Sequence, residues 1–467
     1  LLTHFGMFFH PPALMAGLIG ITVPFAFAIG SLLAGKTGDE WVDAGRVWGM
    51  VSWVLLAGGL LLGSWWAYTI LGWGGFWFWD PVENADFMPW LTGTAFLHSV
   101  MIQEKRNMLK IWNVVLIILT FGLTIVGTYT TRSGIINSVH AFTQSEIGPA
   151  FLIFLALILV IGFALLFKRI QMLESEEKIE YVLCRENVFL AQNVLLVGIA
   201  FTVLLGTTFP LLAEAVRGTK LSIQAPFFNT IIAPMGYMLL LLMGIGMLIA
   251  WRKSSWEGLL RNFKNPVILA TGGTVFLAWF LSDRNLLWSV HTIFWLSIFV
   301  TATIVLELVK AVQAKSSQTE SNYLKGLYYV ISRNPRRYGG LLLHFGVVLM
   351  FLGFAGTFFK VERNMTLESG IPTQIGEYSL VFQQVEEFKV GNATHRASIV
   401  EVFDKEGNLL EVMKPAKSFY PTQPQPLTEV AILRSFLEDL YLIFSSENGG
   451  EQGSVTLRVF INPLIGW

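Results

Sequence analysis

Long apolar runs divide most of the chain into segments of membrane length. Runs of about 20 apolar residues, each able to cross about 30 Å of hydrocarbon, recur ten times. The expected spans are residues 12–34, 47–70, 83–102, 111–130, 149–167, 188–210, 229–250, 266–282, 288–309 and 338–359. Two of the ten, at 83–102 and 266–282, are the least apolar. We therefore expect an all-α polytopic membrane helix bundle over residues 1–359.

Residues 360–467 follow a different pattern, in which apolar and polar residues alternate. The alternation is clear in Tyr378-Ser-Leu-Val-Phe and in Ala397-Ser-Ile-Val-Glu-Val-Phe, and turn signals stand at Asp404-Lys-Glu-Gly-Asn and Glu447-Asn-Gly-Gly. Period-two alternation between turns predicts an antiparallel β domain outside the membrane. The closing Pro463-Leu-Ile-Gly-Trp resembles the approach to a further span, so we expect this domain to be cut before a final helix.

Composition agrees with a bilayer protein. The 467 residues are 54% hydrophobic and 14% charged, whereas an ordinary soluble domain carries about 25% charge. The net charge is zero and no basic tract stands out, so nucleic acid is not an expected partner. The single cysteine, Cys184, forms no CxxC or CxxCH motif. The protein therefore does no dithiol chemistry of its own and is not itself a c-type cytochrome.

Positive charge is unequal between the two sets of alternating loops. One set holds nineteen lysines and arginines, and the other holds only Arg132, Arg217, Lys220 and Arg284. By the positive-inside rule the richer set faces the cytoplasm. The loops 71–82, 131–148 and 211–228, and the β domain, are then expected on the periplasmic side of a bacterial cytoplasmic (inner) membrane.

A loop rich in tryptophan and glycine lies at residues 72–90. Its last part, Asp80-Pro-Val-Glu, has the residues of a helix N-cap, a first-turn proline and a capping box, so Asp80, Pro81 and Glu83 are expected to start the next helix. The cap does not explain the aromatic density. The loop's aromatic and glycine residues are Gly72, Trp73, Gly74, Gly75, Phe76, Trp77, Phe78, Trp79, Phe87 and Trp90.

Such a surface suits a flat apolar macrocycle that carries polar propionates. Asn84 and the free amides at the helix start are candidates to receive a propionate, because helix N-termini attract anions. The alternative is a structural role as an ordinary interfacial belt of aromatic residues. Such a belt needs only one or two aromatic residues at each helix end. The loop is therefore a candidate heme-binding surface, with the interfacial belt as the alternative.

Two histidines stand at matched depth within spans. His98 and His344 both lie about 8–9 Å from the inner boundary by helix rise. Ionisable groups inside spans are rare and usually functional. The pair is therefore a candidate to hold the iron of one b-type heme from its two faces. The alternative is that each ring contacts different neighbours and is only packed.

Two further histidines are expected outside. His10 precedes Pro11-Pro12 at the outer start of the first span, and His140 lies in the outer loop after Arg132. Both would be on the side of the tryptophan loop, where they could supply axial ligands to a second heme, with Arg132 available for a propionate. The alternative is a solvated loop histidine in each case.

These stretches resemble the WWD family of heme-handling membrane proteins. Trp73-Gly-Gly-x-Trp-Phe-Trp-Asp-Pro-Val-Glu-Asn-Ala is similar to the family signature nearly residue by residue. The flanking blocks His10-Pro-Pro, Thr131-Arg-Ser-Gly, Ser138-Val-His-Ala-Phe, Pro210-Leu-Leu-x-Glu-Ala and Ala225-Pro-Phe-Phe-Asn are also similar. With the later histidine span and the β domain, the layout resembles the family's larger heme lyase members. Asp86 departs from the pattern, because a small residue is expected there.

The resemblance implies a heme lyase subunit for c-type cytochrome biogenesis. His10 and His140 would ligate substrate heme on the tryptophan loop while it is joined to the CxxCH motif of apocytochrome c, and His98 and His344 would hold a structural or redox heme b. The implied partners are the periplasmic heme chaperone CcmE, the thiol-handling subunit CcmH and apocytochrome c, with quinol as a further candidate. The alternatives are a heme transporter across the membrane and a heme-loading scaffold without bond-forming activity.

Overall fold

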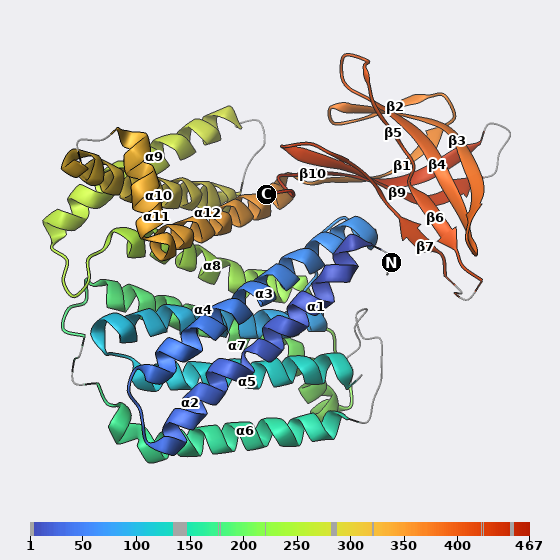
Figure 1. Ribbon diagram of the computed structural model, residues 1–467. Helices are drawn as coiled ribbons and strands as arrows, with labels where there is room; N and C mark the ends of the chain where they lie inside the picture. Colours follow the sequence, from blue (N-terminus) through green and yellow to red (C-terminus); the bar gives the residue numbers. More distant parts are fainter. Residues whose placement is uncertain are drawn as a thin grey trace.

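The chain forms a helix bundle with a β domain at one end (Figure 1). The computed structural model describes residues 4–133, 147–175, 177, 179–219, 221–281, 287–319, 322–421, 423, 425–448 and 453–467. The helices are α1 (Phe5–Gly20), α2 (Thr22–Ala34), α3 (Glu40–Ile70), α4 (Pro81–Arg106), α5 (Lys110–Arg132), α6 (Gly148–Arg169), η1 (Ile170–Leu173), α7 (Arg185–Arg217), α8 (Ala225–Leu248), α9 (Trp256–Phe280), α10 (Trp288–Thr319), α11 (Tyr323–Arg333), α12 (Pro335–Gly356) and η3 (Thr357–Phe359).

The expected fold class, a membrane helix bundle followed by an antiparallel β domain, is confirmed. Among the described residues, eight helical segments are long and apolar enough to cross a membrane, against the ten expected. The two weakest expected spans correspond to α4 and α9, which are helices but fall below that apolarity. In α4 the reason is buried polar side chains, among them Thr92, Ser99 and Gln103, which pack against neighbouring helices instead of lipid.

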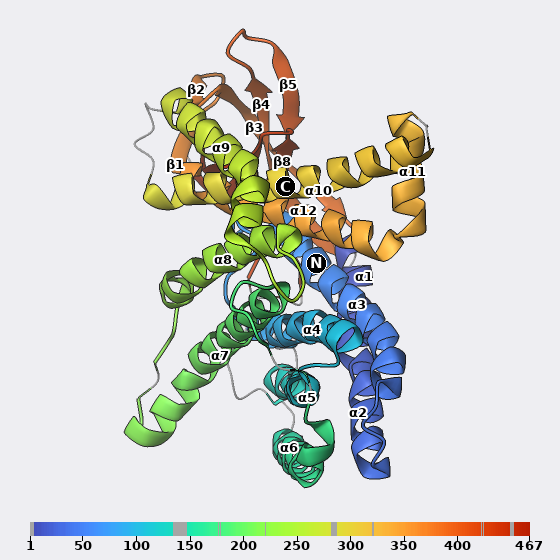
Figure 2. The same cartoon turned by 90° about the vertical axis from the view of Figure 1, so that its left-hand side faces the viewer.

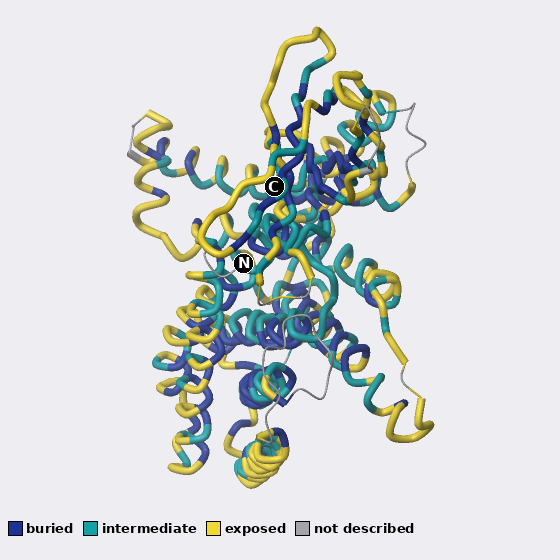
Figure 3. The backbone as a smooth tube through the Cα atoms, turned by 90° about the vertical axis from the view of Figure 1, so that its right-hand side faces the viewer, coloured by how far each residue is buried: buried dark blue, intermediate teal, exposed yellow. Residues whose placement is uncertain are grey.

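The helices form two groups with separate hydrophobic cores. The first core is built from α1 to α7, and the second from α8, α9, α10 and α12. Helix α8 joins them, because one part of it packs on the first core and its end packs in the second. In Figure 2, α5 and α6 are seen nearly end-on, and the second group, with α9, α10 and α12, lies above them in the view. At the edge of the first group, α6 is largely exposed (Figure 3), with only 11% of its span buried, as expected for a helix that faces lipid.

Glycines allow α1 to lie directly against α3. Gly59-Leu-Leu-Leu-Gly63 on α3 is a small-xxx-small motif, which lets two membrane helices approach closely. A Cβ added at Gly59 would lie 2.7 Å from the backbone nitrogen of Leu14, and one at Gly17 would lie 2.5 Å from the backbone nitrogen of Leu56. The same face of α3 therefore fixes the position of α1.

The β domain consists of two packed antiparallel sheets. The four-stranded sheet has the order β1-β10-β9-β8, and the six-stranded sheet has the order β2-β3-β4-β6-β7 with β5 also paired to β4. The strands are β1 (Val361–Glu368), β2 (Pro372–Ile375), β3 (Tyr378–Val390), β4 (Ala393–Phe403), β5 (Leu409–Met413), β6 (Ala416–Phe419), β7 (Leu427–Glu429), β8 (Ala431–Arg434), β9 (Glu438–Asn448) and β10 (Ser454–Pro463).

The four-stranded sheet is buried on both faces. Leu440, Leu442 and Phe444 on β9 point into the core shared with the other sheet. The alternate residues Tyr441 and Ile443 form a second cluster with Tyr68 at the end of α3. Because successive strand residues point to opposite faces, β9 joins the β domain to the bundle.

The close contact between α1 and α3 predicts that the effect of a glycine-to-alanine substitution depends strongly on whether the glycine lies in the contact. Gly17→Ala should destabilise the protein by about 1–3 kcal/mol, the usual cost of overpacking, because the new methyl meets backbone atoms of α3. Gly58→Ala is the matched control, since a Cβ there has no atom within 4 Å and alanine favours helix. Thermal unfolding in detergent measures both, and equal effects of the two substitutions would contradict the packing described.

Candidate functional site

The tryptophan loop lies between α3 and α4 and is anchored by the first turn of α4. The Asp80 side chain accepts from the backbone N–H of Val82 at 3.0 Å, and Glu83 completes the capping box. The Glu83 carboxylate also accepts from the N–H of Phe78 at 2.9 Å. Pro81 is the first helical residue. The predicted cap is therefore confirmed, and its carboxylates hold the loop as well as the helix.

The loop's backbone is supported from beneath by Asn84. Its amide nitrogen donates to the carbonyl of Trp79 and to the hydroxyl of Thr207, both at 3.0 Å. Trp79 has φ of 56°, a left-handed conformation rare for a large side chain. Asn84 is almost fully buried. The Asn84 amide nitrogen therefore stabilises the strained turn at Trp79 and does not point toward the outer surface.

Half-buried tryptophans of the loop continue into a row of aromatic rings. Trp77 meets Trp79 edge-on at 5.9 Å, and Phe87 on α4 contacts both rings. Phe87 stacks on Trp90, which stacks on Trp53 of α3, each at 5.7 Å. These interlocked rings form a broad apolar surface whose shape is fixed by packing.

Helix α8 supplies a further wall of this surface. Trp79 stacks on Phe228 at 4.8 Å, and its indole N–H donates to the side-chain oxygen of Asn229 at 2.8 Å. Phe76, earlier in the loop, stacks on Phe354 of α12 at 6.0 Å. The loop is therefore held by both helix groups.

The β domain contacts the first half of the loop. Gly74 has φ of 68° and lies against the ring of Phe460, where a Cβ would be only 2.8 Å away. Lys360, just before β1, donates to the Gly74 carbonyl at 3.0 Å, and its ammonium lies 4.4 Å from the Phe460 ring centre. Burial lowers the pKa of Lys360 below its ordinary value. Trp73 packs edge-on against Phe78 within the loop.

A buried polar cluster secures the same junction. The Tyr68 hydroxyl donates to Asp439 at 3.0 Å, and the Tyr441 hydroxyl donates to the carbonyl of Tyr68 at 3.0 Å. Asn462 donates to the Tyr68 hydroxyl at 3.2 Å. Burial raises the pKa of the Asp439 carboxyl and raises that of Tyr441 to about 12. The junction thus has satisfied polar groups inside an apolar cluster.

His10 lies in the second turn of α1 with its ring against Gly63 of α3. Its Nδ1 donates to the carbonyl of Gly59 at 2.7 Å. A Cβ at Gly63 would meet the imidazole at 2.5 Å, so the glycine makes the slot for the ring. Arg132 is the exposed last residue of α5. The other expected outer ligand, His140, lies outside the described residues.

The structure brings His98 and His344 together. His98 is on α4 in the first helix group, and His344 is on α12 in the second; the two ring centres are 6.1 Å apart. His98 Nδ1 donates to the carbonyl of Thr94 at 2.8 Å, and the ring meets Phe189 edge-on at 5.7 Å. His344 lies beside the backbone carbonyl of Gly340, one turn earlier on α12.

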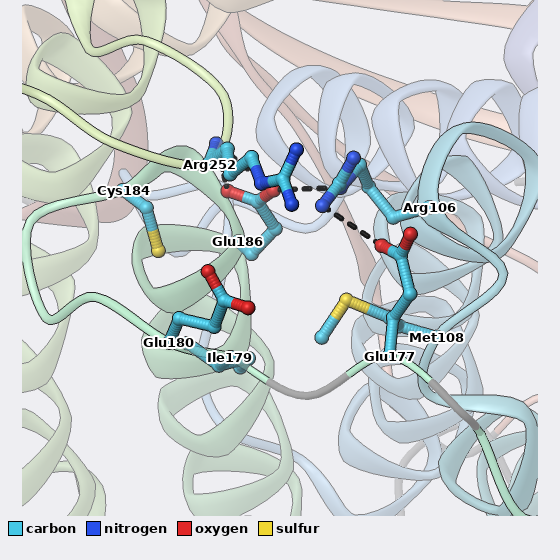
Figure 4. A pocket seen from close by; sticks show the side chains of 8 residues that line it. All are labelled: Arg106, Met108, Glu177, Ile179, Glu180, Cys184, Glu186 and Arg252. Carbon is cyan, nitrogen blue, oxygen red and sulfur yellow. Dashed lines mark hydrogen bonds and ion pairs between the residues drawn. The ribbon is translucent and has the colours of Figure 1, made fainter.

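A separate pocket of about 280 Å³ lies at the end of the bundle opposite the β domain (Figure 4). Its charged lining is largely paired: Glu186 meets Arg106 at 3.3 Å and accepts from the backbone N–H of Arg252, while Arg106 also meets Glu177 at 2.8 Å. Cys184 is buried there and donates to a backbone carbonyl. These pairs tie the segment before α7 to α4 and so have a structural explanation.

Known proteins match the whole chain. A family model described as cytochrome C assembly protein matches residues 1–136, and one described as CcmF C-terminal beta-sandwich matches residues 358–463. A cytochrome c-type biogenesis protein CcmF from Pseudomonas fluorescens is 35% identical over all of this chain and 69% of its own length. The chain belongs to the CcmF family.

Two further CcmF family comparisons agree. The CcmF of Escherichia coli (strain K12) is 34% identical, over 99% of this chain and 69% of its own length. A solved structure titled cytochrome c heme lyase CcmF superposes with a TM-score of 0.81 and 31% identity, over 100% of this chain and 70% of the other. Membership of the CcmF family therefore rests on sequence and fold together.

Several contacts of this CcmF family site were not predicted from the sequence. Trp53 donates to the Thr94 hydroxyl at 2.7 Å, and Lys360 reaches the loop from a distant segment. Asn229 belongs to the Ala225-Pro-Phe-Phe-Asn block, which was recognised as similar to the WWD family but was assigned no role. The similarity of that block to the family was the one signal in the sequence that could have identified Asn229 as part of the site.

The Tyr441 contact can be tested by a single hydroxyl deletion. Tyr441→Phe should cost about 1–3 kcal/mol, because the buried carbonyl of Tyr68 loses its donor. Tyr328→Phe, on the exposed face of α11, should be neutral. Urea or thermal unfolding, together with limited proteolysis at the junction, measures the difference. Equal stability of the two variants would mean that the junction does not depend on this bond.

Proposed function

We propose that the chain works as a heme lyase subunit of c-type cytochrome biogenesis. In this proposal, substrate heme rests on the tryptophan loop with His10 and His140 as iron ligands, and is joined there to the CxxCH motif of apocytochrome c. A second, resident heme b is held by His98 and His344. The observation that carries the proposal is the facing pair of imidazoles between the two helix groups.

The residues of the inner pair fit a bis-histidine heme. A metal bound at about 2 Å from each ring nitrogen separates two imidazole centres by about 6 Å, close to the 6.1 Å observed. The bond from His98 Nδ1 to a carbonyl is the usual support of a ligating histidine and leaves Nε2 for iron. His344 likewise lies beside the backbone carbonyl one turn earlier on its helix, that of Gly340, which leaves its Nε2 for iron in the same way. Bound heme would supply a one-electron redox centre.

The residues of the outer surface fit the substrate role. The Nδ1 bond of His10 to the Gly59 carbonyl sets the tautomer and orientation typical of a metal ligand. The ring row of Trp77, Trp79 and Phe87 offers a rigid apolar surface for the macrocycle. The chain's contribution to the reaction is positioning, which is able to supply several kcal/mol, because the cofactor carries the reactive group.

The proposal includes a location and partners. The β domain and tryptophan loop face the periplasm from the bacterial inner membrane, which the excess of basic residues in the opposite loops supports. Heme arrives from a periplasmic chaperone of the CcmE type. A thiol-handling subunit of the CcmH type keeps the apocytochrome thiols reduced, because this chain has no CxxC motif. Electrons for the inner heme would come from a donor such as quinol.

The inner pair is tested by heme retention. His98→Ala and His344→Ala should each remove the bis-histidine b-type absorption of detergent-purified protein, because losing a ligand weakens metal binding by at least about 100-fold. His291→Ala is the control, because His291 lies on α10 and its ring bonds to the backbone carbonyl of Leu287. Retention of the wild-type spectrum in both ligand variants would refute the inner site.

The outer site is tested by bond formation. Reconstituted protein supplied with heme-loaded chaperone and a CxxCH peptide should form thioether bonds, detected by a pyridine-hemochrome spectrum. His10→Ala should slow this by about 100-fold, a usual cost of misplacing a reactant, while the inner heme spectrum persists. If heme crosses vesicles without bond formation, the transporter alternative is correct. If heme binds but no thioether bond forms even with a CcmH-type partner present, the scaffold alternative is correct.

A further inference from the structure

A group of cations lies beyond the inner histidine pair, on the side away from the β domain. Lys105 follows His98 by seven residues on α4, and Arg337 precedes His344 by seven residues on α12. Residues seven apart lie on one helix face, about two turns or 10 Å along the axis. Since the two helices run in opposite directions through the bundle, both offsets lead to the same end.

A third cation, Arg185, joins them from the start of α7. Its guanidinium donates to the carbonyls of Met247 and Ile249 at 2.9 and 3.0 Å, at the end of α8. The Arg185 guanidinium and the Lys105 ammonium lie 5.3 and 4.9 Å from the centre of the same Trp251 ring. Arg185 is also near enough to Arg337 for their charges to interact.

Aromatic rings connect this group to the inner histidines. His98 meets Phe189 edge-on at 5.7 Å, and Phe189 meets Trp251 edge-on at 5.8 Å. An apolar wall therefore leads from the imidazole to the two cations on Trp251. Such a wall matches a macrocycle, and the cations at its end match the acidic groups on the macrocycle's edge.

The positive charges are incompletely neutralised. Arg337 forms an ion pair with Glu307. For Lys105, the interactions of the described residues include the Trp251 ring and no carboxylate. Arg185 bonds to neutral carbonyls and interacts electrostatically with Glu186, whose carboxylate already pairs with Arg106. Gathering three cations with one direct counter-ion is unfavourable unless an anion joins them. Lys105 and Arg337 are exposed, so a ligand is able to reach them.

We infer that Lys105, Arg185 and Arg337 bind the two propionate carboxylates of the heme held by His98 and His344, and so orient its acidic edge away from the β domain. The inference rests on the proposed function of the inner pair. Charge-assisted bonds of this kind between carboxylates and arginine or lysine are the strong class of hydrogen bond. These residues are positioning residues, because they do not contact the iron.

Heme release provides the test. Full-length protein purified in detergent is mixed with excess apomyoglobin, and the loss of b-type absorption is followed. Lys105→Gln and Arg337→Gln should each release heme about tenfold faster, the effect of about 1.4 kcal/mol. Both should lower the midpoint potential of the heme, because a removed positive charge favours the ferric state. Lys168→Gln, a basic residue at the end of α6, is the matched control and should change neither readout.

A second arm separates heme carboxylates from anionic lipid headgroups as the bound group. Protein stripped of heme is reloaded with heme dimethyl ester, which lacks the carboxylates. The ester should leave wild type about tenfold faster than heme does, and Lys105→Gln should then add no further loss. If Lys105→Gln speeds release of heme and ester equally, the inference is wrong and a lipid or structural role is correct. If wild type holds no b-type heme, the proposed function itself fails.

Discussion

The seam between the two helix groups is the constraint on which the inner site depends. Each group has its own hydrophobic core, so α4 is oriented by α5 and α7 while α12 is oriented by α10. His98 and His344 then meet from opposite sides of the seam. Two imidazoles inside a membrane protein are costly unless they have a function. The two rings therefore come from helices whose positions are set by different neighbours.

Helix α4 relates the two sites to each other. Phe87, Trp90, Thr94 and His98 recur at intervals of three and four residues and so lie on one face. Thr94 accepts from Trp53 through its hydroxyl and from His98 through its carbonyl. The face that carries the aromatic row therefore continues directly into the inner histidine pair.

Local signals in the sequence predicted local structure well. Asp80 and Glu83 form the expected cap because a capping box needs only residues three apart. The pairing of His98 with His344 followed from depth alone, since a bilayer gives every span a common coordinate. Two of the ten expected spans, α4 and α9, are helices of membrane length that are less apolar than the other eight, so apolarity alone does not identify them as spans.

Contacts between distant segments could not be predicted in this way. Lys360 bonds to Gly74, and Tyr68 bonds to Asp439, across several hundred residues. No periodicity or motif in one segment encodes its partner in another. The alternation over residues 360–467 predicted a β domain, but it gave no indication that Tyr441 on β9 would meet the end of α3. The His140 prediction lies outside the described residues.

Helix α12 has a mechanical consequence. It carries His344 in its middle, stacks Phe354 on Phe76 near its end, and continues through a single turn into Lys360 and the β domain. An α-helix is stiff along its axis, so a displacement of one end also moves the other end. A protein that docks on the β domain and shifts it would move the tryptophan loop and the inner imidazole together. One continuous helix thus connects the aromatic contact at the tryptophan loop with His344.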